Sequence, residues 1–225
     1  MQYHTPVLLK ESVEGLNIRP GGVYVDATFG GGGHSSEILK RLGQGRLFVF
    51  DQDEEAAANV PDDERVVFTG NNFCFLKRYM RYYNACPVDG VIADLGVSSH
   101  QVDDAGRGFA FRLDAALDMR MNRTNSRTAA EVVNMYRQED IQKIFGLYGE
   151  VHNAGRLAAA VCRARPLRTA GDLITVLKPC APGGRENRYF AQVFQALRIE
   201  VNDEMNALRE LLAQCAQIIR TGGRM

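Results

Sequence analysis

Asp26, Asp51 and Asp94 each close a short run of apolar residues in the first part of the chain. If those runs are parallel strands, acids at their carboxyl ends can accept hydrogen bonds from ribose hydroxyls or from an amine. The glycines Gly30–Gly33 follow the first acid, and glycine lets backbone N–H groups approach a ligand without a clash from Cβ. Together these residues predict a binding site for a nucleotide-like ligand.

Hydrophobic periodicity indicates the elements that position these residues. The stretch from Val23 to Leu42 passes from a short strand through the glycines into a helix, with Ser35 as its candidate N-cap. A strand, a glycine turn and a helix in that order are typical of the nucleotide-binding half of a doubly wound α/β sheet. The predicted strands are Val23–Asp26, Arg46–Phe50, Arg65–Thr69 and Pro87–Asp94. The first and fourth strands would flank the switch point of the sheet, which would bring the three acids around one crevice.

Two residues near this predicted site have two interpretations each. Asp53 either contacts a ribose or caps a helix predicted at Glu54–Asn59, and the sequence favours neither. Asp51 ends the apolar run, so we interpret it as the ribose contact. Phe73 follows the third strand and either lies against an adenine ring or belongs to the core.

The glycine turn also discriminates between cofactors. A dinucleotide fingerprint requires G-x-G-x-x-G, but Ser35 occupies the third glycine position when the motif starts at Gly30. The spacing from Asp26 to Gly30 and Gly32 fits an S-adenosylmethionine site better, because that cofactor has no pyrophosphate for a helix N-terminus to hold. The sequence therefore favours S-adenosyl-L-methionine over a nicotinamide dinucleotide, and a nicotinamide-dependent oxidoreductase is the weaker alternative.

Composition limits the class of protein. The 225 residues can form one large domain or a domain with an insertion, and no apolar run has the length of a membrane span. The first residues have no basic region followed by an apolar one, so we expect no secretory signal. The 5 cysteines are scattered without a C-x-x-C pair, which favours reduced thiols, a cytoplasmic location and no metal site.

A helical insertion is predicted in the middle of the chain. Thr128 with Glu131, and Thr169 with Asp172, have the spacing of capping boxes that open helices. We expect residues 102–189 to form a helical substrate-recognition subdomain inserted into a Rossmann-like domain of residues 1–101 and 190–225. A long helical stretch from about Tyr189 to Ile219 would complete the chain.

Charge is distributed unevenly between these parts. Residues 1–100 carry 9 Lys+Arg and 13 Asp+Glu, a net of −4, whereas residues 101–190 carry 14 and 10, a net of +4. A polyanion would therefore contact the insertion, although an excess of this size is also typical of an ordinary solvated surface.

Several motifs together resemble the RsmH/MraW family of bacterial methyltransferases, which modify a decoding-centre cytosine of small-subunit ribosomal RNA. The matching stretches, in family order, are His4–Glu11, Asp26–Ser35, Asp94–Gln101, Arg107–Phe111, Leu117–Met121, Tyr148–Glu150 and Phe194–Asn202. The resemblance implies a class I methyltransferase fold, S-adenosylmethionine as the methyl donor, and the N(4) amine of a cytosine in 16S rRNA as the acceptor.

The resemblance also implies roles for individual residues. The implied cofactor contacts are Gly32, Gly33, His34, Asp51, Phe73, Asp94 and Gln101. Asp94 is the candidate catalytic residue, because it would orient the cofactor, accept a hydrogen bond from the amine, or both. The candidate contacts to RNA are Arg107, Arg120, Arg123 and Arg127. Asp118 and Arg120 either line the inner face of the insertion or form a buried structural ion pair.

The end of the sequence departs from the family pattern. The family continues after Gly222-Gly223-Arg224 into further strands, so we expect a truncated sheet in which the fourth strand has lost its neighbour. This leaves an alternative in which the chain is an inactive remnant that binds the cofactor or RNA. The expected partner is the small ribosomal subunit and not a membrane, and a homodimer is one oligomeric state that the sequence allows.

Overall fold

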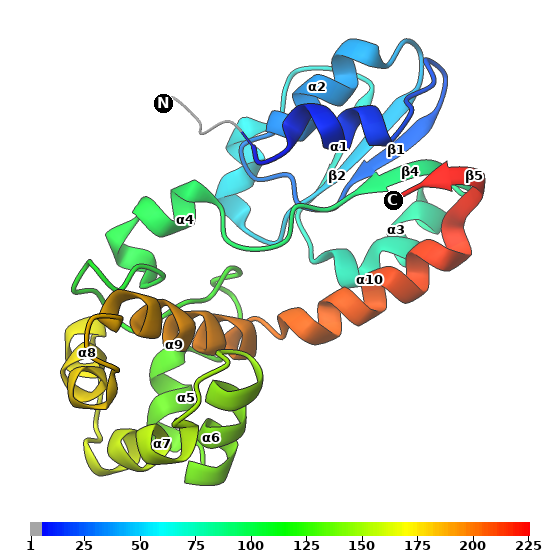
Figure 1. Cartoon of the computed structure of the whole chain (residues 1–225). Coiled ribbons are helices and arrows are strands. Elements are labelled where there is room, and N and C mark those ends of the chain that lie inside the picture. Colours follow the sequence, from blue (N-terminus) through cyan, green and yellow to red (C-terminus); the bar gives the residue numbers. More distant parts are fainter. Residues whose placement is uncertain (1–5) are drawn as a thin grey trace. The chain divides into compact units, whose positions relative to one another are not determined.

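The structure, a computed structural model, describes residues 6–225, and the chain divides into two compact units (Figure 1). Unit 1 contains the chain up to Ser98 together with Met205–Met225, and unit 2 is Ser99–Glu204. His4 and Thr5, which begin the first family motif, lie outside the described residues.

Unit 1 is built on a parallel sheet of 5 strands in the order β3-β2-β1-β4-β5. The strands are β1 (Val23–Asp26), β2 (Arg46–Phe50), β3 (Val66–Thr69), β4 (Val88–Ile92) and β5 (Ile219–Arg224). The chain builds outward from β1 to β3 and then returns to place β4 on the other side of β1. This reversal between β1 and β4 confirms the predicted doubly wound sheet and its switch point.

Alternating side chains of the strands bury both faces of this sheet. On β2, Leu47 and Val49 belong to the apolar cluster that includes residues of α1 and α2, whereas Phe48 and Phe50 belong to the cluster that includes residues of α3 and α10. This period of two, with apolar residues on both faces, is what a parallel sheet covered by helices requires. The helices of unit 1 are α1 (Leu9–Gly15), α2 (Gly33–Arg41), α3 (Leu76–Tyr82) and α10 (Glu204–Ile218), with the short 3-10 helices η1 (Glu54–Asn59) and η2 (Phe73–Phe75).

The last strand, β5, corrects the expectation that the fourth strand has no neighbour. The predicted helix ends at Ile218, and β5 pairs in parallel with β4, with Val88 opposite Ile219. An ion pair of 2.8 Å between Arg220 Nη1 and Asp89 Oδ1 joins the two strands. The edges of the sheet are therefore β3 and β5.

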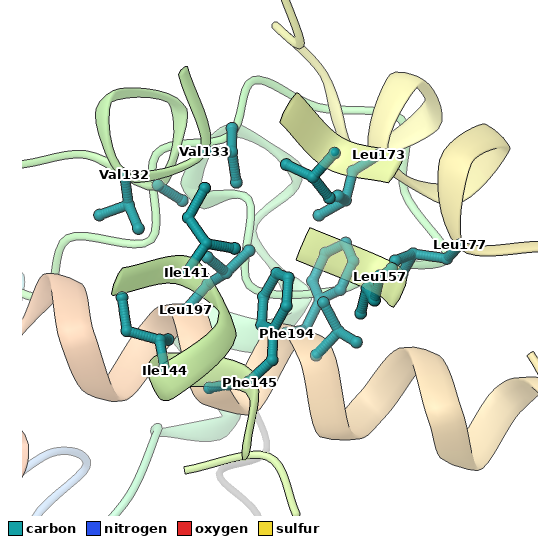
Figure 2. Close-up of a cluster of buried hydrophobic side chains, with 14 of the residues drawn as sticks. Val132, Val133, Ile141, Ile144, Phe145, Leu157, Leu173, Leu177, Phe194 and Leu197 are labelled. Atoms are coloured by element: carbon teal, nitrogen blue, oxygen red, sulfur yellow. The ribbon is translucent and has the colours of Figure 1, made fainter. Parts of the chain in front are cut away.

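Unit 2 consists of helices packed around one apolar cluster. Its helices are α4 (Ser99–Asp103), α5 (Ala129–Met135), α6 (Gln138–Leu147), α7 (Ala154–Arg163), α8 (Ala170–Leu177) and α9 (Glu186–Val201), with η3 (Ala105–Arg107) and η4 (Lys178–Cys180). Both capping boxes are confirmed, at Thr128 for α5 and at Thr169 for α8. Figure 2 shows Phe145, Leu157 and Phe194 converging in the interior of the cluster.

The second boundary between the units lies later in the chain than the sequence predicts. A single helix was expected from about Tyr189, but α9 and α10 are separate, and Asp203 between them has a φ of 50°. α9 belongs to unit 2 because Phe194 and Leu197 are buried in the helical cluster. The apolar face of α9, not the sheet, therefore determines where this helix packs.

The structure also shows the state of the cysteines and the apolar character of the helices. All 5 cysteines are free thiols. No helix in the described part of the chain combines the length and the apolar character needed to cross a bilayer.

Candidate active site

A glycine loop connects β1 to α2 at the switch point of the sheet. Gly30 and Gly32 have φ values of +51° and +75°, the left-handed region that residues with a Cβ rarely adopt. The N-cap of α2 is Gly32, so the helix begins before the predicted cap at Ser35. Ser35 instead lies inside the first turn, where its hydroxyl donates to Oδ2 of Asp26 at 2.7 Å.

Asp26 at the end of β1 is a buried carboxylate that holds this turn together. Besides the bond from Ser35, its Oδ1 accepts from the backbone N–H of Thr28 at 3.1 Å. Burial raises the pKa of Asp26, while these two hydrogen bonds oppose the rise and the charge of Asp94 adds to it. Asp26 lies opposite Ile92 in the pairing of β1 with β4, which places the acids at the ends of these two strands at the same edge of the sheet.

Asp51 follows β2 and contacts the glycine loop. Its Oδ2 accepts from the N–H of Gly30 at 2.8 Å, and its Oδ1 accepts from the N–H of Asp53 at 2.9 Å. Burial raises the pKa of Asp51, and hydrogen bonds from these two N–H groups act against that rise. Asp53 caps η1 by accepting from the N–H of Glu55 at 3.3 Å, which favours the capping interpretation for this residue.

Asp94 follows β4 and has an exposed side chain. Its backbone N–H donates to Oγ1 of Thr28 at 2.7 Å. Thr28 thus connects the glycine turn to the start of the segment after β4, because its own N–H is bound by Asp26. The arrangement fixes the backbone of Asp94 and leaves its carboxylate facing solvent.

Two buried polar atoms in unit 1 have no hydrogen-bond partner among the described residues: Nε2 of His34 and Oγ1 of Thr69. His34 lies in the first turn of α2, and Thr69 is the last residue of β3. Native proteins rarely leave buried polar atoms unpaired unless a ligand or water completes them. These atoms, together with the glycine loop and the strand-end acids, fit the predicted S-adenosylmethionine.

The remaining predicted cofactor contacts differ in position. Gly33 begins α2, and a Cβ added there would lie 2.3 Å from Cγ of Pro6, so the residue must be small. Phe73 begins η2 and is partly buried against the cluster between the sheet and α3. Gln101 is buried in α4 of unit 2, and its contact with the cofactor stays a prediction.

The predicted RNA contact at Arg107 does not fit the structure. Arg107 is only 2% exposed, and its Nη2 donates to the carbonyls of Arg120 and Met121 at 3.1 and 3.0 Å. An arginine enclosed in this way supports the backbone at Arg120 and Met121 and has no surface to offer a phosphate.

The other three candidate arginines are more exposed. Arg120 pairs with Asp118 through two bonds of 2.8 and 2.7 Å, so the interpretation as a structural ion pair is favoured. Arg123 and Arg127 have side chains 43% and 46% exposed, and they pair with Asp104 at 3.4 Å and Glu200 at 3.5 Å. Of the four, these two retain the most surface for a phosphate.

Sequence reasoning missed three residues of the site: Thr28, Asn59 and Thr69. Thr28 is part of the family motif Asp26–Ser35, so its position beside the glycines indicates a place in the site. Asn59 and Thr69 lie outside every motif, and only the folded chain brings Asn59 to the glycine loop. No group of three or more metal-ligating side chains occurs among residues 6–225.

The fold and this site define the class of protein as a Rossmann-like methyltransferase. The sequence matches the MraW methylase family over residues 1–225, and the chain belongs to that family. Two relatives have the name "Ribosomal RNA small subunit methyltransferase H". The protein from Bacteroides thetaiotaomicron is 52% identical over 229 residues, which span 100% of this chain and 75% of the relative. The protein from Parabacteroides distasonis is 54% identical over 228 residues, which span 99% and 75%.

A comparison with solved structures gives a weaker likeness. A crystal structure described as a methyltransferase of an antibiotic biosynthesis pathway from Anabaena variabilis is 16% identical and has a TM-score of 0.34. The match covers 99% of this chain and 97% of the other chain, and a TM-score of that size is too low to relate the two folds.

Proposed function

We propose that this chain transfers a methyl group from S-adenosylmethionine to the N(4) amine of a decoding-centre cytosine in 16S rRNA. The observation that carries the proposal is the glycine loop at the β1/β4 switch point, surrounded by Asp26, Asp51 and Asp94 in a member of the MraW methylase family. The names of the relatives support small-subunit ribosomal RNA as the substrate. A ribosomal substrate in turn supports a cytoplasmic location.

Unit 1 would hold the cofactor. Gly32 and Gly33 would let the backbone approach it, the unpaired Nε2 of His34 would find a polar partner, and Asp51 would accept from the ribose. Phe73 and Gln101 are the remaining proposed contacts. S-adenosylmethionine supplies an activated methyl group, so these residues have to orient the cofactor and need not activate it.

Asp94 is the proposed residue nearest the chemistry. A cytosine amine is a poor nucleophile because its lone pair is delocalised into the ring, so an acceptor for its N–H bonds favours attack. The exposed carboxylate of Asp94 can provide that acceptor, and the bond from its N–H to Thr28 fixes its backbone. Asp94 can also orient the cofactor.

Unit 2 would contribute contacts to RNA. Arg123 and Arg127 are half-exposed cations that pair with Asp104 at 3.4 Å and with Glu200 at 3.5 Å. Each contact with a phosphate releases counterions, so affinity for RNA would fall as salt rises. The target base has to leave any stack before it can react, which favours an unpaired loop of RNA over a duplex.

The test uses tritiated S-adenosylmethionine and small ribosomal subunits that lack the modification. We expect label on one cytosine with the wild-type chain, and at least a tenfold loss of rate in Asp94→Asn when S-adenosylmethionine is saturating. Label on another base, or none from a chain that binds the cofactor, would overturn the proposed reaction. Failure to bind the cofactor in calorimetry would overturn the whole assignment.

A further inference from the structure

Two side chains from the segment after β2 hold the backbone of Gly30, one at its N–H and the other at its carbonyl. The N–H of Gly30 donates to Oδ2 of Asp51 at 2.8 Å, and the carbonyl of Gly30 accepts from Nδ2 of Asn59 at 2.9 Å. Asp51 follows β2, and Asn59 is the last residue of η1. Both residues are partly buried. One short segment thus clamps the glycine loop through a carboxylate and an amide.

The loop needs such a clamp because of its composition. Gly30 and Gly32 both have positive φ, and a run of glycines can adopt many backbone conformations with similar energy. Each residue that is fixed in one conformation loses backbone entropy. A loop that is already fixed in the free protein avoids that cost at the moment of binding, and affinity rises accordingly.

Asn59 contacts the glycine loop with both its side chain and its backbone. Its side chain donates to Gly30, and its backbone carbonyl lies 3.9 Å from the position that a Cβ on Gly32 would occupy. η1 therefore lies along the glycine loop at two of its residues. At the start of η1, the N–H of Asp53 donates to Oδ1 of Asp51, so the same carboxylate that binds Gly30 also binds the beginning of this helix.

We propose that Asn59 is a positioning residue for the methyl-donor site, and that its amide preorganises the glycine loop for the cofactor. This inference rests on the proposed function. It differs from a role for Asp51, because a carboxylate can also accept from the cofactor directly, whereas the donor of Asn59 is directed at the loop.

The amide chemistry of Asn59 gives three informative variants. Asn59→Ala removes the donor. Asn59→Asp keeps the shape but places a carboxylate against the Gly30 carbonyl, on the same residue that Asp51 binds, so it should be more harmful than alanine. Asn59→Gln keeps the donor on a longer arm and should recover part of the function. Asn187→Ala, at an exposed position on α9, is a matched control for the loss of an asparagine side chain.

The experiment measures S-adenosylmethionine affinity by calorimetry and the thermal midpoint of each variant without cofactor. We expect Asn59→Ala to lose about tenfold in affinity, which is about 1.4 kcal/mol, with Asn59→Asp losing more and Asn59→Gln less. In the methylation assay the KM for S-adenosylmethionine should rise, and the KM for the ribosomal subunit should stay the same. The control should match the wild-type chain in all three measurements.

The outcomes separate this inference from the proposed function. If the wild-type chain binds the cofactor and Asn59→Ala binds it equally well at a temperature where both are folded, the positioning role is wrong and the proposed function stands. The same holds if both KM values rise together, since that would indicate a general structural defect. If the wild-type chain itself does not bind the cofactor, both proposals fail.

Discussion

Asp26 in unit 1 and Asn202 in unit 2 are both buried polar side chains, but their surroundings differ. Asn202 accepts from the N–H of Met121 and donates to the carbonyls of Met119 and Arg198, at 2.7, 2.7 and 2.9 Å. Asp26 has two hydrogen bonds and a pKa raised by burial. The amide of Asn202 therefore has hydrogen-bond partners for its oxygen and its nitrogen within unit 2, whereas the carboxylate of Asp26 lies in an environment that disfavours its charge.

The same contrast extends to the neighbours of these residues. In unit 2, the buried guanidinium of Arg107 donates to two carbonyls of the segment that Asn202 also supports. In unit 1, His34 and Thr69 each bury a polar atom without a partner among the described residues. The hydrogen bonds of Asn202 and of Nη2 of Arg107 therefore stabilise a loop of unit 2, and the unpaired atoms of His34 and Thr69 in unit 1 are open to a ligand. Four measurements test this difference between the units.

The largest expected effect is on the apolar core of unit 2. Leu197→Ala removes a side chain that is 0% exposed, which should cost about 2–5 kcal/mol in the free energy of unfolding because a cavity remains. Leu147→Ala, at a position that is 74% exposed, is the matched control and should cost less than about 0.5 kcal/mol. Urea unfolding measures both. Similar costs for the two variants would mean that α9 does not belong to this core.

The next effect concerns the self-contained polar network of unit 2. Asn202→Ala would leave the N–H of Met121 and the carbonyl of Met119 buried and unpaired, which should cost about 1–3 kcal/mol. Because the network involves no ligand group, the loss in the free energy of unfolding should be the same with and without S-adenosylmethionine. A loss that disappears when the cofactor is added would contradict the comparison.

A third measurement uses the pH dependence of unit 1. The raised pKa of Asp26 means that the folded state holds its proton more tightly than the unfolded state, whose carboxyl titrates near 3.8. The stability from the protonated form is fully present below that value and is lost as pH rises through the raised pKa. Asp26→Asn should escape this loss, so its stability relative to the wild-type chain should increase from acidic to neutral pH.

Asp63 provides the opposite sign as a control for that measurement. Hydrogen bonds from Arg65 lower the pKa of Asp63 to about 2, so its contribution is present at neutral pH and is lost as pH falls through that value. Asp63→Asn should therefore be less stable than the wild-type chain at neutral pH, with the difference shrinking in acid. Parallel pH trends for the two variants would argue against a buried Asp26.

The smallest expected effect tests the unpaired hydroxyl of Thr69. Thr69→Val replaces it with a methyl group of similar size, which should raise the free energy of unfolding of the cofactor-free chain by about 1 kcal/mol. The same variant should bind S-adenosylmethionine less tightly if the hydroxyl contacts the cofactor. A destabilised Thr69→Val would indicate that the hydroxyl already has a partner in solution.

Local patterns predict the parts of this fold that depend on neighbours in sequence. The strands β1 and β2 follow from short apolar runs, and the helices α5 and α8 follow from capping boxes three residues apart. The strand-end acids follow as well, because parallel strands place their carboxyl ends at one edge. These features need no information about distant parts of the chain.

The sequence does not reveal features that depend on contacts between distant residues. The periodicity of the sequence predicts that the last helix continues to Ile219, but the chain forms strand β5 from this residue. Pairing with β4 and the ion pair between Asp89 and Arg220 stabilise the strand. The burial of Arg107 depends on carbonyls that the segment after it turns inward. Asn59 and Gly30, which it binds, are separated in sequence by α2 and β2, and no local motif marks this contact.

The order of the segments in unit 1 has a consequence for synthesis of the protein on the ribosome. β4 and the helices α1 to α3 are translated first, then the whole of unit 2, and only afterwards α10 and β5. Until Leu211, Cys215 and Ile218 of α10 have been synthesised, Val88 and Val91 of β4 lack the apolar side chains that they pack against in the folded protein. A nascent chain therefore completes its helical unit while its sheet still has an open edge and an apolar face, and this interval is when premature strand pairing is most probable.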